Sequence, residues 1–197
     1  MAIILGSASP RRQQLLAQMG LRFTVQSPDI DEDAFSGLSP AELVETLSRE
    51  KAACIAAQNA ADDLIIAADT VVVLDGEILG KPQDAADAAK MLSALSGRQH
   101  TVYTGFTVQQ GDKVITRHEA TKVSFRPLSA AEISHYIATG EPMDKAGAYG
   151  IQGFGALLVQ GILGDYFTVM GLPVCALGQV LGEFGINLLT TSSARQR

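Results

Sequence analysis

The chain has 197 residues, of which 47% are apolar and 18% are charged, and its formal net charge is −6. This length supplies enough core for one α/β domain or two closely joined lobes. The acidic balance argues against a general nucleic-acid or anionic-membrane binder, because such proteins present a basic face. It still permits an anionic small substrate, since a pocket can concentrate a few cations while the remaining surface stays acidic.

The expected location follows from the ends of the chain and from its cysteines. Residues 1–5 carry no basic segment and are too short for a signal sequence, and no apolar run approaches the ~20 residues that span a bilayer. Cys54 and Cys175 lie in helical patterns with apolar neighbours and are expected to be buried free thiols in a reducing compartment. We therefore expect a cytoplasmic protein without nucleic-acid or membrane partners, whose last residues, 190–197, fray.

The first strand and helix enclose a loop of small residues. Residues 2–5 predict a short buried strand, residues 6–9 form the loop, and Pro10 is suited to the first position of a helix. Arg11 and Arg12 then fall in the first helical turn, where cations oppose the helix dipole. An anion docked on the free N–H groups would remove this conflict, and two solvated arginines are the plainer alternative.

An acidic segment follows the second expected strand, residues 22–27. It spans residues 28–33 and contains Asp29, Asp31, Glu32 and Asp33. Such a segment is usually a solvated turn, but hard cations such as Mg²⁺ prefer oxygen ligands, so a metal-binding or water-activating carboxylate is the functional alternative.

A long helix begins at a capping box, Ser39 to Glu42, and is expected to run to about Asn59. Its expected inner face contains Leu43, Val44, Leu47, Ala52 and Ile55. Lys51 lies beside charged neighbours on this helix, and the pattern alone places it at the surface.

The segment 64–74 reads as a buried strand interrupted by one carboxylate, Asp69. An Ile- and Val-rich run of this kind is typical of a strand covered on both faces. An ionised carboxylate is costly there unless a metal, a cation or hydrogen bonds satisfy it. Asp69 is therefore a candidate functional residue.

The second half of the chain alternates between helix and strand patterns. Asp84 is expected to cap a helix that ends near Gly97, and Ser129 to Glu132 is a second capping box. The further expected elements are a β-rich region at 99–125 with a hairpin turn at 110–112, a glycine-rich loop at 141–155, strands at 156–160 and 166–170, and a last helix at 173–183.

Several mechanisms lack their motifs in this sequence. It contains neither a Gly-x-Ser-x-Gly nucleophile elbow nor a His-Glu-x-x-His zinc motif. His100, His118 and His135 have no partner motif and are expected to be structural or exposed. Carboxylates and basic residues remain, and this set suits metal-assisted hydrolysis of a phosphate compound.

Six ordered motifs resemble those of the Maf nucleoside triphosphate pyrophosphatases. They occupy residues 7–12, 30–32, 49–52, 68–70, 80–82 and 144–153. The resemblance implies an α/β fold with a mixed central β-sheet flanked by helices, folded as two lobes around a deep active-site groove. We expect one domain over 1–197, with 99–125 contributing to a smaller β-rich lobe.

The resemblance also implies roles for individual residues. Asp69 would be the general base, Glu32 a partner carboxylate, and Lys81 a further catalytic residue. Ser7, Arg11 and Lys51 would bind the triphosphate together with Lys81. Glu32 and Asp69 are the expected ligands of a divalent metal cation, Mg²⁺ or Mn²⁺.

Three motif positions distinguish subgroups of the family, and here they are Arg12, Thr70 and Gln152. This combination resembles the subgroup that acts on dTTP and UTP, and the implied reaction releases the monophosphate and pyrophosphate, with modified pyrimidine nucleotides as further substrates. Two alternatives stay open: a nucleotide-binding regulator of septum formation with little hydrolysis, and the same chemistry on a purine triphosphate. The family resemblance also suggests a homodimer.

Overall fold

The computed structural model describes residues 1–35 and 37–189, so the fraying expected for 190–197 lies outside the described residues. The helices are α1 (Pro10–Gln18), α2 (Pro40–Ala56), α3 (Ala85–Leu95), α4 (Ala130–Ala138), α5 (Tyr166–Met170) and α6 (Val174–Glu183). The strands are β1 (Ile3–Gly6), β2 (Thr24–Gln26), β3 (Leu64–Leu74), β4 (Glu77–Leu79), β5 (Gln99–Gln110), β6 (Lys113–Phe125) and β7 (Val159–Leu163). Within these described ranges no helix has the length and hydropathy needed to cross a membrane.

The strands form one mixed sheet in the order β2-β1-β3-β5-β6-β7, with β4 paired to β3. Strand β1 runs parallel to β2 and to β3, while β4 is antiparallel to β3 and β7 is antiparallel to β6. The expected mixed sheet flanked by helices is therefore confirmed.

The chain divides into two compact units. Unit one comprises residues 1–69, residues 104–118 and the chain from 171 onward, and unit two comprises 70–103 and 119–170. The expected β-rich region at 99–125 is one long hairpin whose tip belongs to unit one and whose two ends belong to unit two. The single domain and the deep groove stay predictions.

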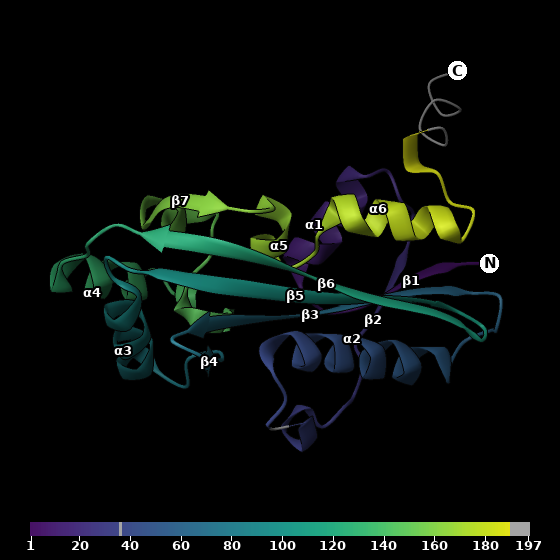
Figure 1. The fold of residues 1–197 in the computed structure, drawn as a ribbon, viewed down its shortest axis with the longest axis horizontal. Coiled ribbons are helices and arrows are strands. Elements are labelled where there is room, and N and C mark those ends of the chain that lie inside the picture. Colours follow the sequence, from purple (N-terminus) through teal and green to yellow (C-terminus); the bar gives the residue numbers. More distant parts are fainter. Residues whose placement is uncertain (36, 190–197) are drawn as a thin grey trace. The chain divides into compact units, whose positions relative to one another are not determined.

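In unit one, α2 runs along one side of the strands and α6 along the other (Figure 1). The predicted capping box opens α2, since the side chain of Ser39 and that of Glu42 each bond the other residue's backbone N–H. The backbone of α2 at Val44 approaches so closely that any Cβ at Gly105 of β5 would clash with it. One turn later, the hydroxyl of Ser48 lies 2.9 Å from the Thr107 hydroxyl of β5. These contacts fix the position of α2 on the sheet.

The core of unit two is built around α3, α4 and three perpendicular rings. The two helices lie side by side (Figure 1) and contribute apolar side chains such as Leu92 and Ile133. The rings of His100, Phe125 and Tyr149 meet edge to face, with centroids 4.7–5.2 Å apart. Nε2 of His100 also lies 2.7 Å from the Tyr149 hydroxyl, so this histidine has a structural role, as expected.

Three expectations about the C-terminal third are wrong. The strand expected at 156–160 begins only at Val159, because residues 153–157 form a 3₁₀ helix. Residues 166–170 form a helix, α5, and not a strand, because Asp165 accepts hydrogen bonds from the backbone N–H (2.7 Å) and hydroxyl (2.9 Å) of Thr168 and so caps a helical turn. The aromatic and β-branched composition of this segment suggested a strand. Cys175 is exposed and not buried, although both cysteines are free thiols.

We predict that His100 makes stability depend on pH. Burial lowers the pKa of His100 from 6.5 to about 4, so the unfolded chain binds this proton more readily between those values. The contribution of neutral His100 to the free energy of unfolding is therefore fully present above pH 6.5. It is lost as the pH falls toward 4, by about 3 kcal/mol in total. Urea unfolding at pH 4–7 of the wild type and of His100→Gln, which retains a polar group for Tyr149, should show a shallower pH dependence for the variant. Parallel curves would contradict the prediction.

Candidate active site

Strands β1 and β2 end at one edge of the sheet in unit one, the parallel strand β3 continues past that level, and polar residues of all three segments lie there. Ser7 follows β1 directly, and Glu32 opens a 3₁₀ helix that follows β2. On β3, Ala67 pairs with the last residue of β1, so Asp69 lies two residues past that level. The carboxyl edge of parallel strands is where α/β proteins commonly bind ligands.

Lys51 joins two of these acids. Its Nζ lies 2.6 Å from Oδ1 of Asp69 and 2.6 Å from Oε1 of Glu32. Lys51 and Asp69 are only 9% and 8% exposed, whereas the Glu32 side chain is 56% exposed. A buried charge requires an opposite charge within bonding distance, and here each of the two buried groups supplies it to the other.

The surface position that the pattern suggested for Lys51 is therefore wrong. The buried stripe of α2 runs through Val44, Ser48, Lys51 and Ile55, at spacings of four, three and four residues. This helical period continues through Lys51, and it was the signal in the sequence that placed the lysine inside. The surface prediction had rested on the positive charge of the lysine and on its charged neighbours.

The loop after β1 is held by Arg12. Its Nη1 donates to the Ser7 hydroxyl oxygen at 3.1 Å, and its Nε donates to the Gly171 carbonyl at 2.7 Å. Burial lowers the pKa of Arg12, while the charges of Asp69 and Glu32 act in the opposite direction. Arg12 is thus in the electrostatic field of the two carboxylates, and it is not a solvated surface arginine.

Arg11 is partly buried in the first turn of α1, beside this loop. Ser9 occupies the N-cap position of α1, but its side chain makes no capping hydrogen bond to the helix. Two cationic residues therefore stand at a helix N-terminus together with the small-residue loop, as the sequence indicated.

The remaining predicted site residues belong to unit two. Thr70 is partly buried on β3, and Lys81 is exposed two residues after β4. Gln152 is exposed and directly precedes the 3₁₀ helix Gly153–Leu157. The structure thus groups Ser7, Arg11, Arg12, Glu32, Lys51 and Asp69 in unit one, and Thr70, Lys81 and Gln152 in unit two.

The two acids fit a divalent cation. Both carboxylates already reach one cationic atom, Nζ of Lys51. Mg²⁺ is commonly held by one or two carboxylates, with water and substrate phosphates completing its shell. No group of three or more His, Cys, Asp or Glu side chains suited to a metal occurs among the residues described, so the candidate set is this pair.

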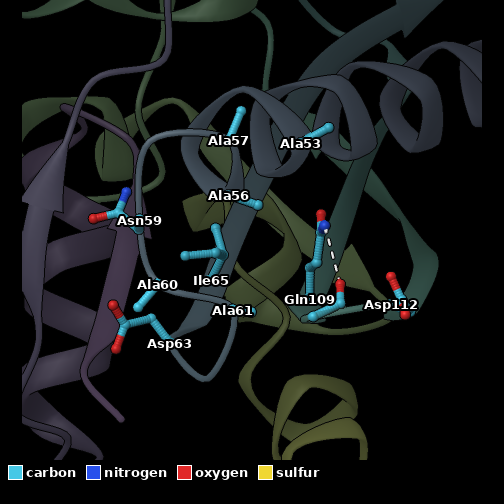
Figure 2. Close-up of a pocket in the computed structure, with 11 residues that line it drawn as sticks. Ala53, Ala56, Ala57, Asn59, Ala60, Ala61, Asp63, Ile65, Gln109 and Asp112 are labelled. Carbon is cyan, nitrogen blue, oxygen red and sulfur yellow. Dashed lines mark hydrogen bonds between the residues drawn. The ribbon is translucent and has the colours of Figure 1, made fainter.

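A separate pocket of about 310 Å³ lies at the C-terminal end of α2 (Figure 2). Alanines of α2 and of the following loop form much of its wall, and the turn of the β5–β6 hairpin closes one side. None of the predicted site residues lines it.

The fold and the site define a class of protein: a mixed α/β protein that combines arginine, lysine and carboxylates at the carboxyl edge of parallel strands, a set suited to phosphate compounds. A family model described as Maf-like protein matches residues 2–184. The chain belongs to the Maf family.

Its relatives include proteins named dTTP/UTP pyrophosphatase from three bacteria. The Moorella thermoacetica protein is 53% identical over 94% of this chain and 96% of its own length. Those of Symbiobacterium thermophilum and Bacillus pumilus are each 50% identical, over 95% and 93% of this chain and 96% and 97% of their own lengths. The solved Staphylococcus aureus Ham1 protein is 15% identical with a TM-score of 0.47, over 64% of this chain and 72% of that chain, which is too distant to bear on function.

We predict that Lys51 and Asp69 are coupled in stability. Lys51→Met leaves the Asp69 carboxylate buried without its ammonium, and it should lower the free energy of unfolding by about 3 kcal/mol. Adding Asp69→Asn removes the orphaned charge and should restore part of this loss. A double-mutant cycle in urea unfolding measures the coupling. Additive effects of the two substitutions would contradict it.

Proposed function

We propose that this protein hydrolyses dTTP and UTP to the monophosphate and pyrophosphate. Membership of the Maf family and the names of its relatives support this activity. The observation that carries the proposal is the cluster of Glu32, Lys51 and Asp69 beside the Arg12 loop. A protein that only bound nucleotides would gain nothing from carboxylates placed beside phosphates, because like charges repel.

The cationic residues neutralise the triphosphate. Arg11, Lys51 and Lys81 bind its oxygens, and the Ser7 hydroxyl donates a further hydrogen bond. Charge-assisted bonds of this kind are about twice as strong as neutral ones, and they stabilise the negative charge that moves toward the leaving group. When Lys51 turns to a phosphate, it releases the oxygens that it holds in the structure.

Asp69 acts as the general base. Its carboxylate takes a proton from water, whose oxygen bonds to phosphorus at the anhydride between the α- and β-phosphates. The bridging oxygen departs with the other phosphorus, so the products are the nucleoside monophosphate and pyrophosphate. Proton transfer by a positioned carboxylate contributes about 10²–10⁴-fold to a rate.

Glu32 and Asp69 would hold the divalent cation, Mg²⁺ or Mn²⁺, as oxygen ligands. When bound, the cation supplies positive charge to the phosphates and lowers the pKa of water. Because Lys51 now bonds to both acids, it must leave them for this cation to be held.

Arg12, Thr70 and Gln152 set the preference for the nucleobase of the substrate. The amide of Gln152 offers both a donor and an acceptor to the edge of a pyrimidine. This pairing favours dTTP and UTP over purine triphosphates.

We predict that Asp69→Asn lowers the rate of pyrophosphate release from UTP by ~100-fold or more, because the carboxylate that acts as general base is lost. Nucleotide affinity should change far less, since the substitution keeps the size of the side chain and removes one negative charge near the phosphates. Pyrophosphate release and calorimetric binding of UTP measure the two effects. Wild-type turnover in the variant would show that Asp69 is not the base.

We also predict that removal of divalent metal abolishes the activity. Treatment with a chelator should stop pyrophosphate release, and Mg²⁺ or Mn²⁺ should restore it. A panel of dTTP, UTP, ATP and GTP tested with each metal gives the preference for the base in the same assay. Full activity in the chelator would refute the assigned metal role of Glu32 and Asp69.

A further inference from the structure

The carboxylate of Glu141 is a hydrogen-bond hub in unit two. Its Oε1 accepts from the Tyr136 hydroxyl at 2.9 Å and from the Gly155 backbone N–H at 3.0 Å. Its Oε2 accepts from the Phe154 backbone N–H at 2.9 Å. The mechanism above uses neither Glu141 nor Tyr136.

The same hub reaches the chain on the other side of Gln152. The Tyr136 hydroxyl accepts a hydrogen bond of 3.2 Å from the Gly150 backbone N–H, and this tyrosine of α4 is only 5% exposed. Gly150 and Gly155 are also buried, whereas Gln152 between them is exposed. The loop is therefore bonded before Gln152 to Tyr136 and after it to Glu141, and the side chain of Gln152 between the two attachments is exposed.

Two glycines are required by this packing. Gly153 has a φ of +65°, and a Cβ there would lie 2.5 Å from Oε2 of Glu141. A Cβ at Gly155 would lie 2.7 Å from the Tyr136 hydroxyl oxygen. The glycines thus let the loop wrap around the carboxylate, which explains why this segment is rich in glycine.

Glu141 is held in its ionised form. Burial acts to raise the pKa of Glu141, but the hydrogen bonds from Gly155, Phe154 and Tyr136 outweigh it and lower the pKa below its ordinary value. An ionised carboxylate accepts at both oxygens, whereas an amide of the same shape would direct N–H groups at donors.

We propose that Glu141, together with Tyr136, is a positioning residue for base selection, which fixes the backbone on both sides of Gln152. The inference rests on the proposed function, in which Gln152 pairs with the pyrimidine. Hydrogen-bond readout of a base requires the reading group to be held within about 0.5 Å of its productive position. An exposed side chain cannot achieve this alone, so the partly buried acid that bonds to the loop sets the geometry.

The test compares Glu141→Gln with a matched control, Glu132→Gln. Glu132 also lies in unit two and also accepts bonds, from Ser129 in the capping box of α4 and from Arg126. Arg126 in turn donates to the Leu157 carbonyl, which lies beyond the attachments at Gly150 and Gly155. Both variants lose a hydrogen-bonded carboxylate, so both measure the general cost of that loss. Only Glu141→Gln changes the group that accepts from the Phe154 and Gly155 backbones, just after Gln152.

For Glu141→Gln, KM for UTP should rise about tenfold, which corresponds to one or two lost charge-assisted hydrogen bonds, with kcat within about threefold of wild type. The kcat/KM ratio of UTP to GTP should fall by about the same factor. Inhibition by inorganic tripolyphosphate, which has no base, should not change. The amides of Phe154 and Gly155 should lose protection from hydrogen exchange, while Glu132→Gln leaves KM, selectivity and these amides as in wild type.

Tyr136→Phe provides an independent variant, because it removes only the hydroxyl between Gly150 and Glu141. It should raise KM for UTP in the same direction by about threefold, and it decides the question if Glu141→Gln does not fold.

The positioning role is overturned if folded Glu141→Gln or Tyr136→Phe keeps the wild-type KM and UTP-to-GTP ratio, or if Glu132→Gln changes them equally. It is also overturned if tripolyphosphate inhibition weakens together with UTP binding, since the effect would then lie at the phosphates. Failure of the proposed function is recognised separately, because the wild type would then release no pyrophosphate from UTP. In that case the ratio of UTP to GTP dissociation constants replaces the kinetic ratio and decides the positioning role.

Discussion

The burial of one ammonium between two carboxylates is the constraint on which the rest of unit one depends. Lys51 reaches Asp69 because α2 lies directly on β5 at Gly105, is bonded to it through Ser48, and packs on β1 and β3 through Ala52 and Ile55. Glu32 reaches the same ammonium from the 3₁₀ helix after β2. Transferring a charge from water to the protein interior costs free energy, so buried charges are tolerated where each is paired with an opposite charge. A site for a highly charged substrate thus begins as a set of charges that satisfy one another.

Local chemistry made most of the secondary structure predictable. The boxes at Ser39 and Ser129 opened helices as expected, because capping depends on residues only three apart. The strand around Asp69 and the hairpin at 99–125 were likewise evident from apolar runs and a turn. The helix at 166–170 was missed, because its cap at Asp165 is weaker evidence than an aromatic and β-branched composition.

The candidate site was predictable by residue type but not by pairing. Asp69 stood out as an acid in a buried strand, and the arginines stood out at a helix start. The pairing of Lys51 with Asp69 depends on the helical period of α2 and on the order of the strands. Strand order is a long-range property that residue spacing cannot reveal. The hydrogen bonds of Glu141 were harder to predict, because two of their donors are backbone N–H groups, which every residue type except proline carries. The glycines that let this backbone approach the carboxylate are the only indication in the sequence.

The contact between Gly105 of β5 and Val44 of α2 supports the helix that carries Lys51, and so it bears on the chemistry at Asp69 of another strand. Most enzymes can adjust a helix by exchanging one side chain for another of similar size, because side chains deform. At Gly105 a backbone rests on a backbone, so a substitution there cannot adjust the spacing without a clash. Changes that alter the Lys51–Asp69 separation must therefore act through other contacts of α2, such as that of Ser48 with Thr107, or through the residues of the site itself.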